Sequence, residues 1–251
     1  MYINDVHILW YLIIGILGGV IGQCLTFANK RLEEEKSVFT KEFFKQDKAL
    51  KRLNYPLIIS MALIYVVILY VCQIQFDFVK DLKLIKYLIL APMLVSAFVI
   101  DYKHQIIPNR LNLSMFEIGL VFTFLYGAFV DLQVAKDMLL GSLVGAGIFL
   151  IITLIGGAIA GKEAMGFGDV KLMGAMGLFF GMMNMIAIAV LSFLIGAMIS
   201  VFLLVTKKKK TSEYIPFGPF IVIAAFIVMC VPFPILLVSL FKIFSLGLYQ
   251  G

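Results

Sequence analysis

Two aspartates stand out because each lies at the edge of a long apolar stretch. Asp101 follows the run YLILAPMLVSAFVI, and Asp169 lies in GFGDVKLM, just before another apolar run. An ionised carboxylate beside hydrocarbon is costly, so such residues are candidates for function. If both lie at one membrane face, one carboxylate can activate water while the other protonates a carbonyl or a leaving amine. This chemistry hydrolyses peptide bonds without a metal or a covalent intermediate.

The composition indicates the environment of these aspartates. Of 251 residues, 62% are hydrophobic and 14% are charged, and the mean hydropathy is +1.05. These values exclude an ordinary soluble domain and indicate a polytopic membrane protein. The first apolar run has no basic region before it, so we expect a retained span rather than a cleaved signal peptide. We predict that residues 1–251 form a single membrane-embedded domain.

The apolar runs predict an all-α fold with about eight transmembrane helices. They cover residues 8–27, 57–76, 84–100, 112–130, 138–160, 172–183, 185–206 and 217–245. The sixth and seventh form one charge-free run broken only near Asn184, so we expect the sixth to be short, tilted or re-entrant. The third is short, and we expect Lys86 near its start to snorkel to the interface.

Charge predicts the orientation of these helices. If the charged loop 29–56 is cytoplasmic, sixteen of the 21 Lys and Arg residues lie on the cytoplasmic side, and both termini lie outside. Two spans separate Asp101 from Asp169, so both emerge on the cytoplasmic face. The run Lys207–Lys210 is interpreted as a topology anchor that attracts anionic lipid, not nucleic acid.

Glycines spaced four residues apart predict close helix packing. The GxxxG spacing lets helix backbones approach in a bilayer and carries no chemistry of its own. The pairs are Gly15/Gly19, Gly18/Gly22, Gly141/Gly145, Gly157/Gly161 and Gly177/Gly181.

Each aspartate also has a purely structural interpretation. Asp169 precedes a helical run, where it could serve as an N-cap. Asp101 could bond to the turn QIIPN that follows it. Together these interpretations are weaker, because each aspartate borders an irregular, glycine- or proline-containing loop at one face.

Other site chemistries have less support. The alternative from another class is a transporter or channel in which Asp101 and Asp169 relay protons or bind a cation, but such proteins place acidic residues near mid-span and repeat their architecture. The chain has no CxxC pair and no HExxH motif, so we expect no metal site. His104, three residues after Asp101, is more simply an interfacial residue.

These motifs resemble those of the bacterial type IV prepilin peptidases, which are membrane-embedded GxGD aspartyl proteases. Asp101, followed by IIPN (Ile106–Asn109), is similar to the first aspartate motif of that family. GFGDVKL (Gly166–Leu172) is similar to the second, GxGDxKL, and is the most specific signal. IPFGPF (Ile215–Phe220), which opens the last span, also matches.

The resemblance implies a catalytic pair, Asp101 and Asp169, at the cytoplasmic face of a bacterial plasma membrane. The substrates would be prepilins or pseudopilins of type IV pili, type II secretion or DNA uptake. Their short basic leader is cut just before an apolar helix, typically after a glycine. Seven further residues are expected to bind substrate or shape its loops: Gly166, Gly168, Lys171, Pro108, Asn109, Pro216 and Gly218.

The chain also departs from the family pattern. At the end of the first span, Gly22 and the pair Arg31-Leu32 keep the family spacing, but QCLT (Gln23–Thr26) replaces the usual SFLN. The first cytoplasmic loop lacks the two CxxC pairs that many members carry. Peptidase activity is therefore expected, whereas methylation with S-adenosylmethionine is not, and we expect no cofactor.

Overall fold

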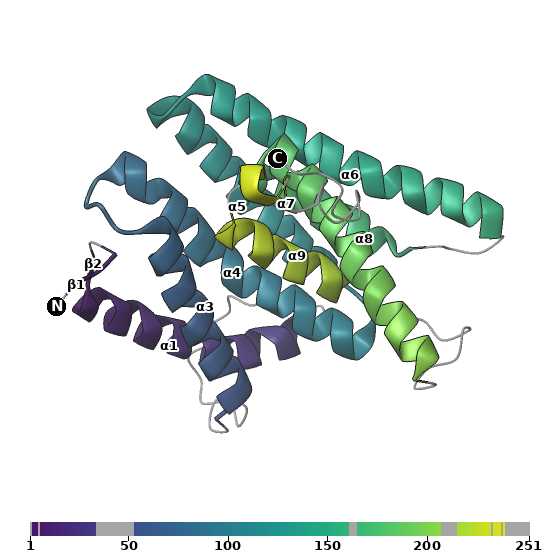
Figure 1. The fold of residues 1–251 in the computed structure, drawn as a ribbon, viewed down its shortest axis with the longest axis horizontal. Helices are drawn as coiled ribbons and strands as arrows, with labels where there is room; N and C mark the ends of the chain where they lie inside the picture. Colours follow the sequence, from purple (N-terminus) through teal and green to yellow (C-terminus); the bar gives the residue numbers. More distant parts are fainter. Residues whose placement is uncertain are drawn as a thin grey trace.

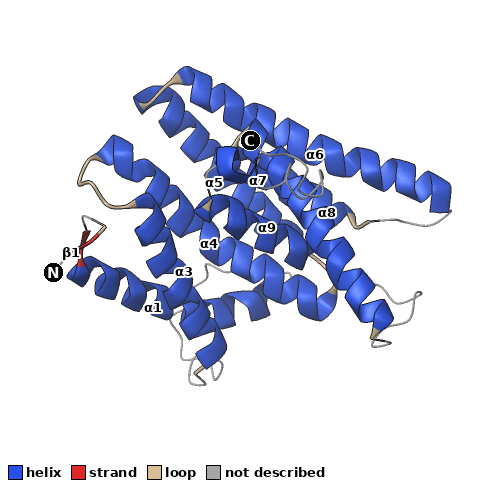
Figure 2. Ribbon diagram, viewed as in Figure 1, coloured by secondary structure: helices blue, strands red, loops and turns tan. Residues whose placement is uncertain are grey.

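The computed structural model describes residues 2–4, 6–33, 53–160, 165–206, 215–231, 233–236 and 238. Within these residues nearly all regular structure is helical, as Figure 2 shows. The exception is a short antiparallel pair near the N-terminus, formed by β1 (Tyr2–Ile3) and β2 (Val6–His7). The predicted all-α class is confirmed, with this small addition.

The described helices follow the predicted apolar segments in order. They are α1 (Ile8–Glu33), α3 (Tyr55–Cys72), α4 (Phe78–His104), α5 (Asn109–Phe129), α6 (Leu132–Ala160), α7 (Phe167–Phe180), α8 (Met182–Val205) and α9 (Gly218–Cys230). Six of them are long and apolar enough to cross a membrane, whereas α7 has 14 residues and α9 has 13. The chain is therefore a multi-pass membrane protein, and its sixth segment is short, as predicted.

The break between the sixth and seventh segments lies at Gly181, not at Asn184. Gly181 separates α7 from α8 with a φ of 77°, a left-handed conformation that favours glycine. The Asp137 carboxylate on α6 accepts a hydrogen bond from the Met182 N–H at 3.3 Å. Asn184 lies within α8 and donates to the Phe180 carbonyl at 2.8 Å. Hydropathy did not locate this turn because the residues around it are almost all apolar.

Lys86 lies inside the protein, so the prediction that it snorkels to the interface is wrong. The helix α4 begins at Phe78, capped by the Asp77 side chain, and Lys86 is therefore more than two turns into it. Its side chain is 7% exposed. Its ammonium lies 4.7 Å from the ring centroid of Tyr126 and 5.3 Å from that of Tyr87. The electron-rich ring faces stabilise the cation there.

Two pairs of helices pack closely through the predicted glycines. Figure 1 shows α1 beside α3 and α6 along α7. A Cβ at Gly18 of α1 would lie only 2.7 Å from the Met61 carbonyl oxygen on α3. Gly177 of α7 lies directly against the backbone of Gly141 on α6, where a side chain has no room. The absence of a Cβ is what lets these backbones meet.

The helices α4, α7 and α9 form the interior of the bundle. Every residue of α7 from Leu172 to Phe180 is buried, because α4, α5, α6 and α8 pack around it. The helix α9 packs against both α4 and α8, near the centre of Figure 1. The C-terminal end of α4 lies beside the N-terminal ends of α7 and α9. The interior helices thus bring the predicted motifs to one end of the bundle.

Candidate active site

The candidate site lies where α4 ends and where α5, α7 and α9 begin. Asp101 lies in the last turn of α4, and Asp169 lies in the first turn of α7. The chain reverses after α4 at Gln105, whose φ of 57° ends the helix. The loop that follows packs against Gly168, where a Cβ would lie 3.3 Å from the Cβ of Ile107. The two aspartate motifs are therefore in direct contact.

Asp101 is held by the first residue of α9. The aspartate is 4% exposed, and its Oδ2 accepts a hydrogen bond from the Gly218 N–H at 2.9 Å. The free N–H groups and the dipole of a helix N-terminus stabilise negative charge. A Cβ at position 218 would lie 2.6 Å from this oxygen, so only glycine permits the contact. The carboxylate of Asp101 thus bonds to a distant helix, not to the turn that follows it.

Asp169 is as deeply buried as Asp101, at 4% exposure. The N-cap position of α7 is Gly166, and no side chain caps this helix among the described residues. Asp169 lies three positions further on, within the first turn. The interpretation of Asp169 as a helix cap is therefore wrong.

The two carboxylates are close enough for the charge of Asp101 to act on Asp169. Two acids so placed, with little access to water, do not both ionise readily, because like charges repel and burial disfavours each charge. Such a pair can share one proton. One member is then a base and the other an acid, which is the combination that water-mediated hydrolysis needs.

Hydrogen bonds fasten the start of α5 to the start of α7. The Lys171 Nζ donates to the Asn109 Oδ1 at 2.7 Å. The Asn112 Nδ2 donates to the Gly168 carbonyl at 3.3 Å. Both bonds flank Asp169 and hold the loop that carries it. Sequence reasoning selected Lys171, Asn109 and Gly168 but missed Asn112, whose only signal was a polar residue one helical turn after Asn109.

The remaining predicted loop residues lie at the same end of the bundle. Pro108 is buried and is the N-cap residue of α5. Pro216 is buried two residues before Gly218. His104, in contrast, is half exposed, and its Nε2 lies 3.4 Å from the Glu33 Oε1 on α1. It therefore links α1 to α4. Within the described ranges, no cluster of three His, Cys, Asp or Glu residues suited to a metal is found.

Comparisons with known proteins show which family the segment with these motifs resembles. Residues 88–201 match the type IV leader peptidase family. The chain is 34% identical over 142 residues to a prepilin leader peptidase/N-methyltransferase of Xanthomonas campestris, which covers 56% of this chain and 48% of that protein. It is 33% identical over 142 residues to the protein of the same name from Aeromonas hydrophila, covering 57% and 48%. For that of Pseudomonas aeruginosa the identity is 32% over 136 residues, covering 54% and 46%.

These matches cover only part of each protein. The chain spans about half the length of the curated relatives that it matches. No solved structure matches the chain significantly. The matched segment runs from within α4 to within α8 and contains both Asp101 and Asp169. Residues 88–201 of this chain are therefore similar to the type IV leader peptidase family.

Proposed function

We propose that this protein is a membrane aspartyl endopeptidase that removes the short basic leader from type IV prepilins or pseudopilins. The observation that carries the proposal is that Asp101 and Asp169 are both buried on two motifs that contact each other. Two buried acids from separate motifs lie at one end of the bundle and interact through their charges. The family match covers both of them.

The surroundings of the two acids favour different roles. The Gly218 N–H and the N-terminus of α9 favour a charged Asp101, which would take a proton from the attacking water. Asp169 would hold the proton and deliver it to the amine that leaves. The proton that Asp101 took from water then passes to Asp169, so the pair returns to its starting protonation without a covalent enzyme intermediate.

The proposed cut takes place at the cytoplasmic face of a bacterial plasma membrane, with both termini outside. The distribution of Lys and Arg supports this orientation, because it gives the aspartate end of the bundle the positive charge that cytoplasmic loops carry. Most of the charged loop, residues 34–52, lies outside the described residues. The proposal includes neither N-methylation nor a cofactor, because that loop has no cysteine.

Co-expression with a prepilin-like probe tests the proposal. The probe has a short basic leader that ends in glycine, followed by an apolar helix. Wild type should cleave after this glycine, whereas Asp101→Asn and Asp169→Asn should each lose activity on the order of 100- to 10,000-fold. Gel shift and N-terminal mass spectrometry report the cut, and the product mass reports any methyl group.

Asp131→Asn is the matched control for this experiment. Asp131 is exposed at the start of α6, where it caps the helix by accepting from the Gln133 N–H at 2.9 Å, and asparagine also caps well. The cleavage rate of Asp131→Asn should equal that of wild type. Cleavage by both Asp101→Asn and Asp169→Asn at the wild-type rate would reject the peptidase and favour an ion-handling role for the pair.

A further inference from the structure

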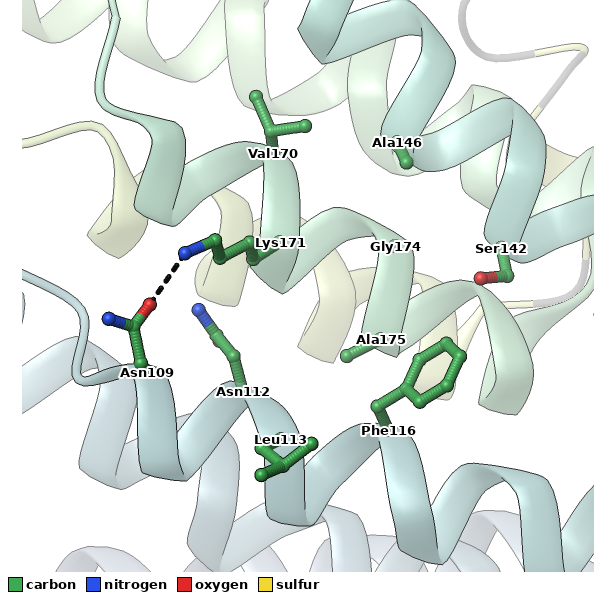
Figure 3. Close-up of a pocket in the computed structure, with 10 residues that line it drawn as sticks. All are labelled: Asn109, Asn112, Leu113, Phe116, Ser142, Ala146, Val170, Lys171, Gly174 and Ala175. Carbon is green, nitrogen blue, oxygen red and sulfur yellow. Dashed lines mark hydrogen bonds between the residues drawn. The ribbon is translucent and has the colours of Figure 1, made fainter.

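A groove lies beside Asp169, between α5, α6 and α7. Its volume is about 530 Å³, and Val170 and Lys171, the two residues after Asp169, line it. Figure 3 shows the bond between Lys171 and Asn109 at one end of this groove, with Phe116 and Ser142 further along it. Most of the lining is apolar. The groove therefore lies next to the helical turn that carries Asp169, along the part of the bundle that apolar side chains cover.

Asn112 is the unexplained polar group in this groove. The residue is 4% exposed and extends from α5 toward α7 in Figure 3. Its Nδ2 donates to the Gly168 carbonyl, but its Oδ1 is buried with no hydrogen-bond partner among the residues that the structure describes. A buried acceptor without a donor is costly in a membrane protein. An N–H group that enters the groove would remove this cost.

The groove fits a peptide better than it fits a lipid. Ala146, Gly174 and Ala175 line it, and small residues of this kind let a helix backbone approach closely. A lipid acyl chain fits the apolar lining but offers no N–H group to Asn112. A peptide that is cut must be locally extended, so its backbone N–H groups beside the scissile bond lack helical partners. Such N–H groups need an acceptor in this environment.

We propose that this groove binds the apolar segment that follows the scissile bond of the substrate, and that the Asn112 Oδ1 accepts a backbone N–H from its first, unwound residues. This inference rests on the proposed peptidase function. Asn112 is a substrate-binding residue in it: the Gly168 bond fixes its amide on one side, and the substrate bonds to it on the other. Lys171 and Asn109, which are exposed and bonded to each other, lie at one end of the groove.

Disulfide cross-linking tests the location. A variant with Cys24, Cys72 and Cys230 changed to alanine, shown to cleave the probe, receives Asp101→Asn so that bound probe stays intact. Ser142→Cys then places one thiol in the groove. Probes carry one cysteine at successive positions after the cleavage site. Ser142→Cys should form an adduct at a helical subset of these positions.

Ser60→Cys is the matched control for cross-linking. Ser60 has the same intermediate exposure as Ser142 and lines a separate apolar groove of about 370 Å³ between α3, α4 and α9. It should form no adduct. Equal labelling of both sites, or none at Ser142→Cys, overturns the groove assignment and is the outcome expected if lipid fills the groove. Failure of wild type to cleave the probe would instead reject the peptidase itself.

Backbone esters test the hydrogen bond to Asn112. Synthetic probes replace one peptide N–H at a time with an ester oxygen in the first apolar residues. In wild type, one of these esters should lower kcat/KM roughly tenfold, as loss of one hydrogen bond does. In Asn112→Leu the same ester should have no further effect. If Asn112 only stabilised the fold, the loss of kcat/KM from the ester and the loss from Asn112→Leu would add. That result would overturn the assignment.

Discussion

The Gly218 N–H donates to the Asp101 Oδ2 at 2.9 Å, although the two residues are 117 positions apart in the chain. The bond joins the last turn of α4 to the first residue of α9. It directs the positive end of the α9 dipole at a buried carboxylate. Because no side chain fits between the two groups, position 218 controls where that carboxylate lies.

Gly218→Ala should inactivate the protein without preventing its insertion. The new Cβ would lie 2.6 Å from the Asp101 Oδ2 and 3.0 Å from its Cγ, so the carboxylate must move. A displacement of about 1 Å typically costs on the order of 100-fold in rate. Probe cleavage measures the loss, and gel filtration in detergent checks the fold. Gly19→Ala, which meets only an ordinary contact with Ile58 at 3.5 Å, should keep full activity.

The pH dependence of kcat/KM should be bell-shaped. At low pH both Asp101 and Asp169 are protonated, so no base is present to activate water. At high pH both are ionised, so no acid protonates the leaving amine. The measurement is kcat/KM for the probe in vesicles buffered on both sides. A profile that rises to a plateau with a single limb would show that only one of these acids titrates in catalysis.

Removal of the bond between Lys171 and Asn109 should weaken catalysis moderately. Their side chains bond at 2.7 Å, but both residues are exposed, so we expect a loss of about 1 kcal/mol, or roughly fivefold in kcat/KM. Lys171→Met and Asn109→Leu should each show this loss. The double variant should be no worse than either single one, because both changes break the same bond. Lys136→Met, at an exposed site on α6, is the control.

Close packing of α6 on α7 should depend on Gly177. A Cβ at this position would collide with the backbone of Gly141, and such overpacking costs about 1–3 kcal/mol. Gly177→Ala should therefore lower the thermal unfolding midpoint in detergent. Gly147→Ala on α6, where nothing lies within 4 Å of the added Cβ, should leave it unchanged. Equal midpoints for the two variants would contradict the packing argument.

The amino-acid sequence by itself determined the helical segments and the end of the bundle that carries the aspartates. Hydropathy reports the free energy of moving each residue from water into hydrocarbon, so apolar runs mark the helices. The number of spans between Asp101 and Asp169 then places both at the same end. The GxGD stretch and the IPN turn pointed to the family that residues 88–201 match.

Only the tertiary structure decided which groups meet across helices. The Gly218 N–H reaches Asp101, Lys86 lies over Tyr126, and Asn112 donates to the Gly168 carbonyl while its side chain lines a groove. Hydropathy assigns each residue a cost, but a hydrogen bond or a ring contact depends on the distance between two atoms. That distance is set by how helices far apart in the sequence pack, and a single residue's polarity does not encode it.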